Sequence, residues 1–490
     1  MFALALSQPD QPPRAVGAGG PLFRWDREGL FRDLEREFLE AAGASPEEAR
    51  GRARAREAEG RAVLARLAGA PGVPAPEDLL CLEEVQFRLG ALAAAHRELL
   101  PLLAGFTAEA RLAALDAARR SGPPGVLPLD SLYRVVAGGR AALDEALAQH
   151  GPDALPALLP LGAVPSASPS VLVHGVRVHS GDLLLSRGGA PTSALIARGS
   201  DYPGVFSHAA LAHVDPTSGR AVAVEALIER GAVVSSLEAY LGDPKLRILL
   251  LRLRPDHPAL TGQPELPHRA ASAMLARVRG GPIPYDFPMD WEDPSALFCS
   301  EVLYHAYRPL GVELWSRRSR ISAPGLAGWL AALGVRHFTT LVPSDLEYDP
   351  ALAPVAEWRN PEGLARDRFD SAILDALLEA AEGGVARLGY AGWELPVARL
   401  AKGWSVLAGA LGAEPPIPAG MSAGAALRVR ALTRRVHPRI LGGLEARAAR
   451  FREHRGFEPP YWELVALARE AVAQTAPDLY PALRIAPAGP

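Results

Sequence analysis

A short segment in the second half of the chain combines residue types suited to nucleophilic chemistry. It reads YDFPMDWEDPSALFCSEVLYHAY over residues 285–307 and contains Cys299, one of only two cysteines in the protein. Asp293 can cap a helix and Pro294 suits a first helical turn, so the pattern predicts a helix that starts close to Cys299. The buried stripe of this helix would consist of Val302, Leu303, Ala306 and Leu310.

A thiol near the start of a helix has a setting that favours its reactive form. Cysteine attacks as the thiolate, and the unpaired N–H groups and the dipole of a helix N-terminus stabilise negative charge. Cys299 is therefore a candidate nucleophile, although a buried structural cysteine explains this segment, taken alone, equally well. Cys81 has leucine instead of a cation beside it in the helical run LLCLEEVQF, which favours a role in core packing.

A catalytic cysteine needs a base, and His208 in VFSHAALAHVD is the informative histidine among twelve. Its segment is typical of a strand, DPTSG of a turn, and RAVAVEALI of a second strand. If Val214 lies opposite Ala221, then Glu225 lies diagonally across from His208 on the same face, at about 7–8 Å between backbones. A slip of one residue would move Glu225 to the other face. Either residue alone is more often an ordinary polar group.

The other histidines do not favour a metal site. His213 follows His208 by five residues on the same predicted strand, so the two side chains point to opposite faces. His174 and His179 have the same spacing and the same difficulty. We therefore expect neither a metal nor another cofactor.

The surrounding elements predict an α+β domain between two helical regions. Residues 1–165 are typical of amphipathic helices, and residues 350–490 are again helical. Between them, residues 166–349 contain short β-branched or alternating runs, such as VLVHGVRVHSGDLLLSRG and LRILLLRLRP, interrupted by helical patterns. A small antiparallel sheet with packed helices is the simplest architecture for this pattern. The proline-broken ALPALLPLGAV, residues 154–164, resembles a linker.

The composition is that of a soluble globular protein, with 49% hydrophobic residues, 22% charged residues and a net charge of −3. This balance indicates neither nucleic acid nor an acidic membrane as a partner. Two cysteines exclude a disulfide framework and fit a reducing compartment. The apolar run in the N-terminal MFALALSQPDQPPRA is shorter than the core of a signal peptide. No stretch of the chain approaches the length of apolar sequence that a transmembrane span needs. The expected location is the cytoplasm.

Three segments together resemble a known superfamily. They are GDLLLSRGGAPTSALIARGSDYPGVFSHAALA, VEALIERGAVVSSLEAYL and IPYDFPMDWEDPSALFCSEVLYHAY. They are similar to the circularly permuted papain-like cysteine hydrolases of the NlpC/P60 superfamily, with the YiiX- and YaeF-type proteins and the lecithin:retinol acyltransferase-like enzymes nearby. The resemblance covers about 150 to 180 residues in the middle of the chain. The order histidine, polar residue, cysteine is that of the permuted members.

The resemblance implies roles for particular residues. Cys299 in FCSEVL matches the family nucleophile, His208 in SHAALA the family histidine, and Glu225 in VEA the polar third member. Tyr285 in PYD matches a tyrosine expected to bind substrate or to stabilise an oxyanion. Gly181 and Asp182 match a GD pair, for which we favour a turn role.

These matches lead to three functional hypotheses. The first is a cysteine amidase or peptidase that acts on a peptide or an acyl-amide small molecule through a Cys-His-Glu triad. The second is an acyltransferase or lipid-acyl hydrolase of the lecithin:retinol acyltransferase type, for which the Ala- and Leu-rich flanks could supply an apolar channel. The third is a non-catalytic binding protein on the same scaffold. The sequence does not indicate the oligomeric state.

Overall fold

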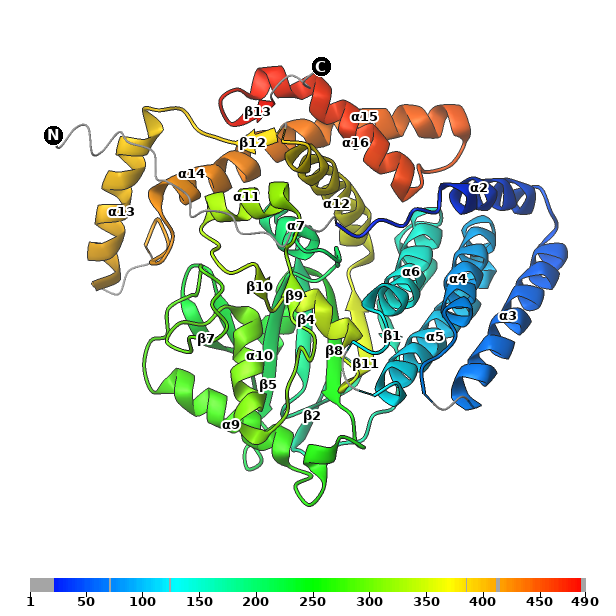
Figure 1. Cartoon of the computed structure of the whole chain (residues 1–490), viewed down its shortest axis with the longest axis horizontal. Coiled ribbons are helices and arrows are strands. Elements are labelled where there is room, and N and C mark those ends of the chain that lie inside the picture. Colours follow the sequence, from blue (N-terminus) through cyan, green and yellow to red (C-terminus); the bar gives the residue numbers. More distant parts are fainter. Residues whose placement is uncertain (1–21, 70–71, 123–124, 385, 411–414, 486–490) are drawn as a thin grey trace.

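The computed structural model describes residues 22–69, 72–122, 125–384, 386–410 and 415–485 of the 490-residue chain. Helices come first, a region with a central sheet follows, and helices return toward the C-terminus (Figure 1). This is the α+β architecture with helical flanks that the sequence predicts. The N-terminal run MFALAL lies outside the described residues.

A seven-stranded sheet forms the centre of the molecule, with strand order β1-β11-β8-β4-β5-β6-β7. All neighbouring strands in it are antiparallel. The bounds are β1 Leu158–Pro160, β4 Leu183–Gly188, β5 His208–Val214, β6 Ala221–Leu227, β7 Gly231–Ser236, β8 Lys245–Leu253 and β11 Leu352–Arg359. The four predicted strand segments supply β4, β5, β6 and β8, in the middle of this sheet.

Apolar side chains cover both faces of the sheet because successive residues of a strand point to opposite sides. Leu183, Leu185 and Leu211 face the helices α9 and α10. Leu184 and Ala210 face the helix α8 and the hairpin of β2 and β3. The bounds are α8 Leu237–Gly242, α9 Leu266–Arg279, α10 Cys299–Tyr307, β2 Ser170–Val173 and β3 Val176–His179.

The remaining elements build the flanks and their connections. The N-terminal helices are α2 Glu28–Ala42, α3 Pro46–Gly69, α4 Pro76–Ala95, α5 Leu100–Arg120 and α6 Leu129–Ala148. The central region adds α7 Pro191–Arg198, α11 Pro324–Leu333, β9 Ser319–Arg320 and β10 Thr339–Thr340. The C-terminal part has α12 Pro361–Glu382, α13 Glu394–Ala410, α14 Ala423–Ala431, α15 His437–Arg455 and α16 Tyr461–Thr475, with the strands β12 Ala386–Leu388 and β13 Leu483–Ile485.

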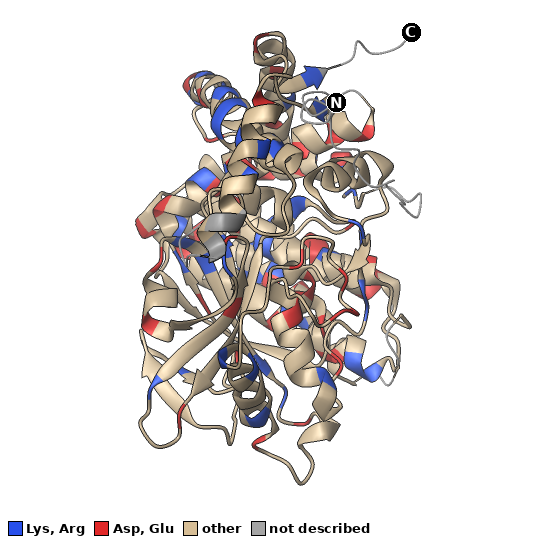
Figure 2. Ribbon diagram, turned by 90° about the vertical axis from the view of Figure 1, so that its left-hand side faces the viewer, with Lys and Arg blue, Asp and Glu red and all other residues tan. Residues whose placement is uncertain are grey.

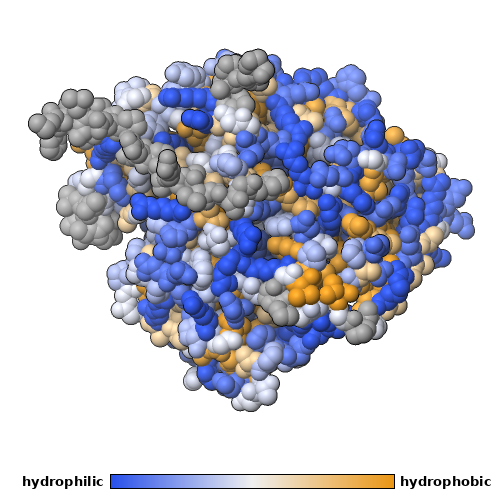
Figure 3. All heavy atoms as spheres, in the orientation of Figure 1, coloured by the Kyte–Doolittle hydropathy of each residue, from blue (hydrophilic) through white to orange (hydrophobic). Residues whose placement is uncertain are grey.

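Charges of both signs are spread over the molecule (Figure 2), and the face seen in Figure 3 is largely hydrophilic, with apolar side chains in separate patches. Within the described ranges, no helix has both the length and the apolar character that a bilayer crossing requires.

Two strands of the sheet lie outside residues 166–349. The supposed linker ALPALLPLGAV contains β1, which pairs with β11 at the edge of the sheet, where a proline is tolerated. The strand β11 contains Pro354, and its register with β8 shifts between Pro354 and Ala356. A proline within a run weakens the strand signal, which explains why the pattern did not reveal this strand. The division of the chain at residues 165 and 349 stays a prediction.

Gly181 and Asp182 form a tight junction that leads into β4. Gly181 has a φ of +96°, and a Cβ at this position would lie 2.6 Å from the backbone carbonyl carbon of Pro267. The Asp182 carboxylate accepts two hydrogen bonds from Arg252, from Nε and from Nη2, each 2.7 Å long. It also accepts a hydrogen bond from the backbone N–H of His179 at 2.7 Å. These contacts agree with a structural role for the pair.

We expect Asp182→Ala to lower the free energy of unfolding by about 3–5 kcal/mol, because it leaves the buried Arg252 guanidinium without its counter-ion. Urea unfolding followed by tryptophan fluorescence measures the change. Asp33→Ala is the matched control, since the ion pair of Asp33 with Arg36 is exposed and contributes little. Equal effects of the two substitutions would contradict this account.

Candidate active site

Cys299 is the first residue of α10, so its N–H has no acceptor within the helix. The helix begins later than expected from Asp293 and Pro294. Asp293 instead accepts a hydrogen bond from the N–H of Ser295 at 2.9 Å, because aspartate stabilises isolated turns as well as helix starts. At the N-terminal end of α10, the carboxyl of Glu301 accepts a hydrogen bond from the N–H of the capping residue Phe298 at 2.7 Å.

His208 and Glu225 are brought together by the register of β5 and β6. Ala210 pairs with Glu225, as the sequence predicts, so Glu225 lies diagonally across from His208. The ring nitrogen Nε2 of His208 lies 2.7 Å from Oε2 of Glu225. The other carboxylate oxygen of Glu225 accepts a hydrogen bond from Oγ of Ser235 on β7 at 2.9 Å. Both oxygens of Glu225 therefore have a partner.

Cys299 lies close enough to His208 to affect the proton affinity of its ring. Burial alone would lower the pKa of His208, but hydrogen bonds with Cys299 and Glu225 and the charges of both raise this pKa to about 9. Burial alone would raise the pKa of Glu225, but the hydrogen bond and the charge of His208 lower it. The pKa of Glu225 therefore lies below its usual value. At neutral pH His208 is therefore an imidazolium beside an ionised Glu225.

The three side chains are largely shielded from solvent. Cys299 is 5% exposed, and the side chains of His208 and Glu225 are 19% and 7% exposed. Interactions between charges are stronger in such surroundings than in water, because the local dielectric constant is lower. Three residues that are distant in the sequence thus meet in one partly closed site.

Tyr285 lies in the segment between α9 and α10, close enough for the charge of Cys299 to affect it. Burial first, and then the charge of Cys299, raises the pKa of Tyr285 well above its usual value. The phenol therefore keeps its proton and can donate a hydrogen bond. Its ring packs against Phe287, with the centroids 5.0 Å apart.

The sequence did not point to two polar neighbours of the histidine. Ser186 on β4 pairs with His208 across the strands, and its Oγ accepts a hydrogen bond from the hydroxyl of Tyr240 at 3.0 Å. The rings of Tyr240 and His208 are inclined at 30° to each other, with centroids 6.3 Å apart. Ser186 lies next to His208 only because β4 pairs with β5, and no local sequence pattern predicts that pairing.

Glu301, in the first turn of α10, is a buried carboxyl next to the thiol. Burial first, and then the charges of Asp286, Cys299 and Asp290, raise the pKa of Glu301 to about 10, although the hydrogen bond from Phe298 lowers it. Glu301 is therefore neutral at pH 7 and places no negative charge at the start of α10. The sequence presented it only as a residue of the motif FCSEVL.

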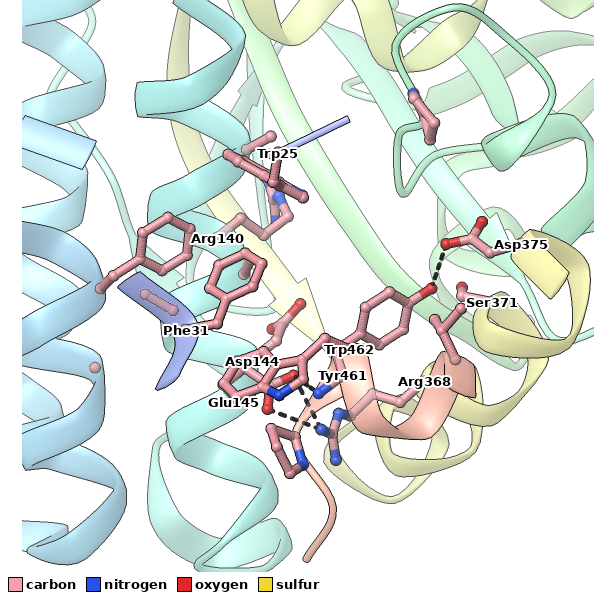
Figure 4. A pocket seen from close by; sticks show the side chains of 18 of the residues that line it. Trp25, Phe31, Arg140, Asp144, Glu145, Arg368, Ser371, Asp375, Tyr461 and Trp462 are labelled. Carbon is pink, nitrogen blue, oxygen red and sulfur yellow. Dashed lines mark hydrogen bonds and ion pairs between the residues drawn. The ribbon is translucent and has the colours of Figure 1, made fainter. Parts of the chain in front are cut away.

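A cavity of about 930 Å³ lies elsewhere, where the N-terminal helices, the central region and the C-terminal helices meet. Aromatic rings and paired charges line it, among them Trp25, Phe31, Asp144, Arg368, Tyr461 and Trp462 (Figure 4). Phe31 and Trp462 stack with centroids 4.9 Å apart. None of the four predicted site residues is among the described residues that line this cavity.

Metal-binding geometry is not found around the histidines that we considered. Across the described part of the chain, no three His, Cys, Asp or Glu side chains are grouped to hold a metal ion. His213 instead lies 3.1 Å through Nε2 from Oγ of Ser272. Nδ1 of His179 lies 2.9 Å from the carbonyl oxygen of Ser168.

Comparisons with known proteins agree with the resemblance seen in the motifs. Neither the curated proteins nor the solved structures yield a significant match. A family model does match, over residues 177–356, and it describes a permuted papain-like amidase enzyme of the YaeF/YiiX type, the C92 family. This central segment, which contains Cys299, His208 and Glu225, is thus similar to a family of amidases with the permuted papain-like fold.

Proposed function

We propose that the protein is a cysteine amidase or peptidase that cleaves an amide bond in a peptide or an acyl-amide small molecule. In this proposal Cys299 is the nucleophile, His208 the acid and base, and Glu225 the residue that orients His208. The observation that carries it is the 2.7 Å contact of His208 with Glu225 next to Cys299, which is the first residue of a helix and lies close enough to raise the pKa of His208. Nucleophile, base and orienting group in this order are the requirement for thiol acyl chemistry.

The reaction begins with the Cys299 thiolate and the His208 imidazolium. The thiolate attacks the carbonyl carbon, and the N–H of Cys299 and the hydroxyl of Tyr285 are the candidate donors to the oxyanion. His208 then gives its proton to the leaving amine as the C–N bond breaks, which leaves a thioester on Cys299. Water, deprotonated by His208, attacks the thioester and releases the carboxylic acid and the thiolate. Glu225 remains ionised and holds the ring.

The two alternatives from the sequence receive less support. An acyltransferase would need an apolar channel at the thiol, yet the cavity that the flanks form contains neither Cys299 nor His208 in its lining and has many charged residues. A binding protein on a decayed scaffold would not need the 2.7 Å contact of His208 with Glu225 or the raised pKa of His208.

The acyl-enzyme identifies the substrate class directly. We expect that brief incubation with mixed peptides, followed by acid quench and intact-mass measurement, adds the acyl part of a peptide to Cys299. The Cys299→Ser variant converts a labile thioester into a more stable ester and can extend the lifetime of the adduct. A fatty-acyl mass from phospholipid mixtures would instead favour the transferase, and no adduct from either source would contradict thiol acyl chemistry.

A further inference from the structure

Glu225 is held from both neighbouring strands of the sheet. It lies on β6, and its partners in register are Ala210 on β5 and Val233 on β7. His208 and Ser235 lie two residues from these partners, so both are diagonal neighbours of Glu225 on the same face. Because β5 and β7 both run antiparallel to β6, the two neighbours lie on opposite diagonals. One polar side chain therefore approaches the carboxylate from each side.

The two oxygens of the Glu225 carboxylate have different partners. Oε2 lies 2.7 Å from Nε2 of His208, and Oε1 accepts a hydrogen bond from Oγ of Ser235 at 2.9 Å. Within the described ranges, no further hydrogen bond from the protein reaches this carboxylate. The terminal torsion of a glutamate side chain is only weakly restrained by its own geometry. The hydroxyl of Ser235 therefore fixes the plane of the carboxylate once His208 occupies the other oxygen.

The plane of the carboxylate decides how the imidazole of His208 is held. The contact uses Nε2, which leaves Nδ1 as the ring nitrogen that can exchange a proton with the thiol or the leaving amine. A carboxylate that accepts the Nε2 proton fixes both the tautomer and the orientation of the ring. Rotation of the carboxylate would break this contact. Water cannot readily replace it, because the side chain of Glu225 is only 7% exposed.

Ser235 is held in place because β7 passes directly into α8. The next residue, Ser236, caps this helix, and its Oγ accepts a hydrogen bond from the N–H of Ala239 at 3.1 Å. Further along α8, Tyr240 is buried, and its hydroxyl donates a hydrogen bond to Oγ of Ser186 on β4 at 3.0 Å. The end of β7, an edge strand of the sheet (Figure 1), is therefore anchored through α8 to the middle of the sheet.

From this geometry we propose that Ser235 is a positioning residue of the reaction, which acts on His208 through Glu225. This role rests on the proposed function, because it belongs to the same acyl chemistry. Ser235 exchanges no proton with the substrate, and its hydroxyl keeps the Glu225 carboxylate in the orientation that holds the imidazole. The sequence VVSSLEAYL contains two adjacent serines, and only the register of β6 with β7 shows which of them reaches Glu225.

The hydrogen bond from Ser235 also affects the charge of Glu225. Burial raises the pKa of this carboxyl. The hydrogen bond and charge of His208, followed by the hydrogen bond from Ser235 and the charge of Lys245, bring the pKa below its usual value. Tyr240 on α8 also interacts with the charge of Glu225. Without the hydroxyl of Ser235 the pKa of Glu225 therefore rises, so the carboxyl takes up a proton at a higher pH and supports the imidazolium less well.

Variants of Ser235 test the proposal through the alkylation of Cys299 by iodoacetamide, which requires no knowledge of the substrate. Ser235→Val and Ser235→Thr have nearly the same shape and differ in the hydroxyl. We expect Ser235→Val to move the acidic limb of the alkylation profile to higher pH and to lower kcat on an amide substrate by about tenfold, with KM unchanged. Ser235→Thr should stay close to the wild type in both measurements. Ser235→Ala should behave like Ser235→Val, and it keeps the test decisive where the larger valine disturbs β7.

The matched control is Ser236→Ala, because the neighbouring hydroxyl caps α8 and does not serve Glu225. This control should lower the Tm and leave the pH profile in place. The proposal is overturned if Ser235→Val and Ser235→Ala match the wild type, if Ser235→Thr shows the same defect as Ser235→Val, or if Ser236→Ala moves the pH profile equally far.

Failure of the proposed function has a different signature. In that case His208→Ala would also leave the alkylation profile of Cys299 unchanged, and the role of Ser235 would fall with the amidase. If His208→Ala changes this profile while the Ser235 variants do not, the amidase proposal stands and only the role of Ser235 is refuted.

Discussion

Replacing Cys299 with alanine is expected to lower amide hydrolysis by about 10⁴-fold or more, because no other group can form the acyl-enzyme. The fold should be unaffected, because the substitution removes a single sulfur atom from a large cluster of buried side chains. The measurement is kcat/KM on the substrate that the acyl-enzyme experiment identifies, together with a thermal unfolding curve.

The chain contains its own control for this prediction. Cys81 is half-buried, and burial, followed by the charge of Glu59, raises the pKa of its thiol. Cys81→Ala should therefore retain full activity, and iodoacetamide at neutral pH should modify Cys299 much faster than Cys81. Equal alkylation of the two thiols, or full activity of Cys299→Ala, would remove the basis for a catalytic Cys299.

The position of Glu225 could be predicted because the turn DPTSG joins two neighbouring antiparallel strands, so that pairing Val214 with Ala221 sets the partner of every other residue. A slip of one residue would move Glu225 to the other face of the sheet. The pairing of Ala210 with Glu225 follows from this local arithmetic. The sequence could not place Cys299 beside His208 by such means, because that contact joins separate elements and came only from the family resemblance.

The features that the sequence did not reveal depend on contacts between distant residues. Proline in β11 hid a strand whose place in the sheet is fixed by pairing with β8. The start of α10 at Cys299 depends on the carboxyl of Glu301, and an aspartate upstream gave an equally good capping signal. The apolar face of α13 with Val397, Leu400 and Trp404 is exposed, although its periodicity is that of a buried face. Periodicity shows that a face is apolar but does not show what covers it.

We expect His208→Ala to lower kcat/KM by about 10²–10⁴-fold, because it removes both the base and the acid of the reaction. It should also slow alkylation of Cys299 at neutral pH and make the rate rise only near pH ~8.5, the value of a free thiol. An unchanged alkylation profile would show that the imidazolium does not stabilise the thiolate. The substitution leaves Ser186 and Tyr240 in contact, so the sheet should remain folded.

The pH dependence of the wild type follows from the same histidine. With a pKa of about 9, His208 is protonated below that pH and can give its proton to the leaving amine. Activity should therefore persist through neutral pH and fall as pH rises through about 9. Glu225→Gln keeps a hydrogen-bonding partner but removes the negative charge that helps to raise the pKa of His208. In this variant the alkaline fall should occur at a lower pH, whereas a residue with only a structural role would reduce stability without moving the pH profile.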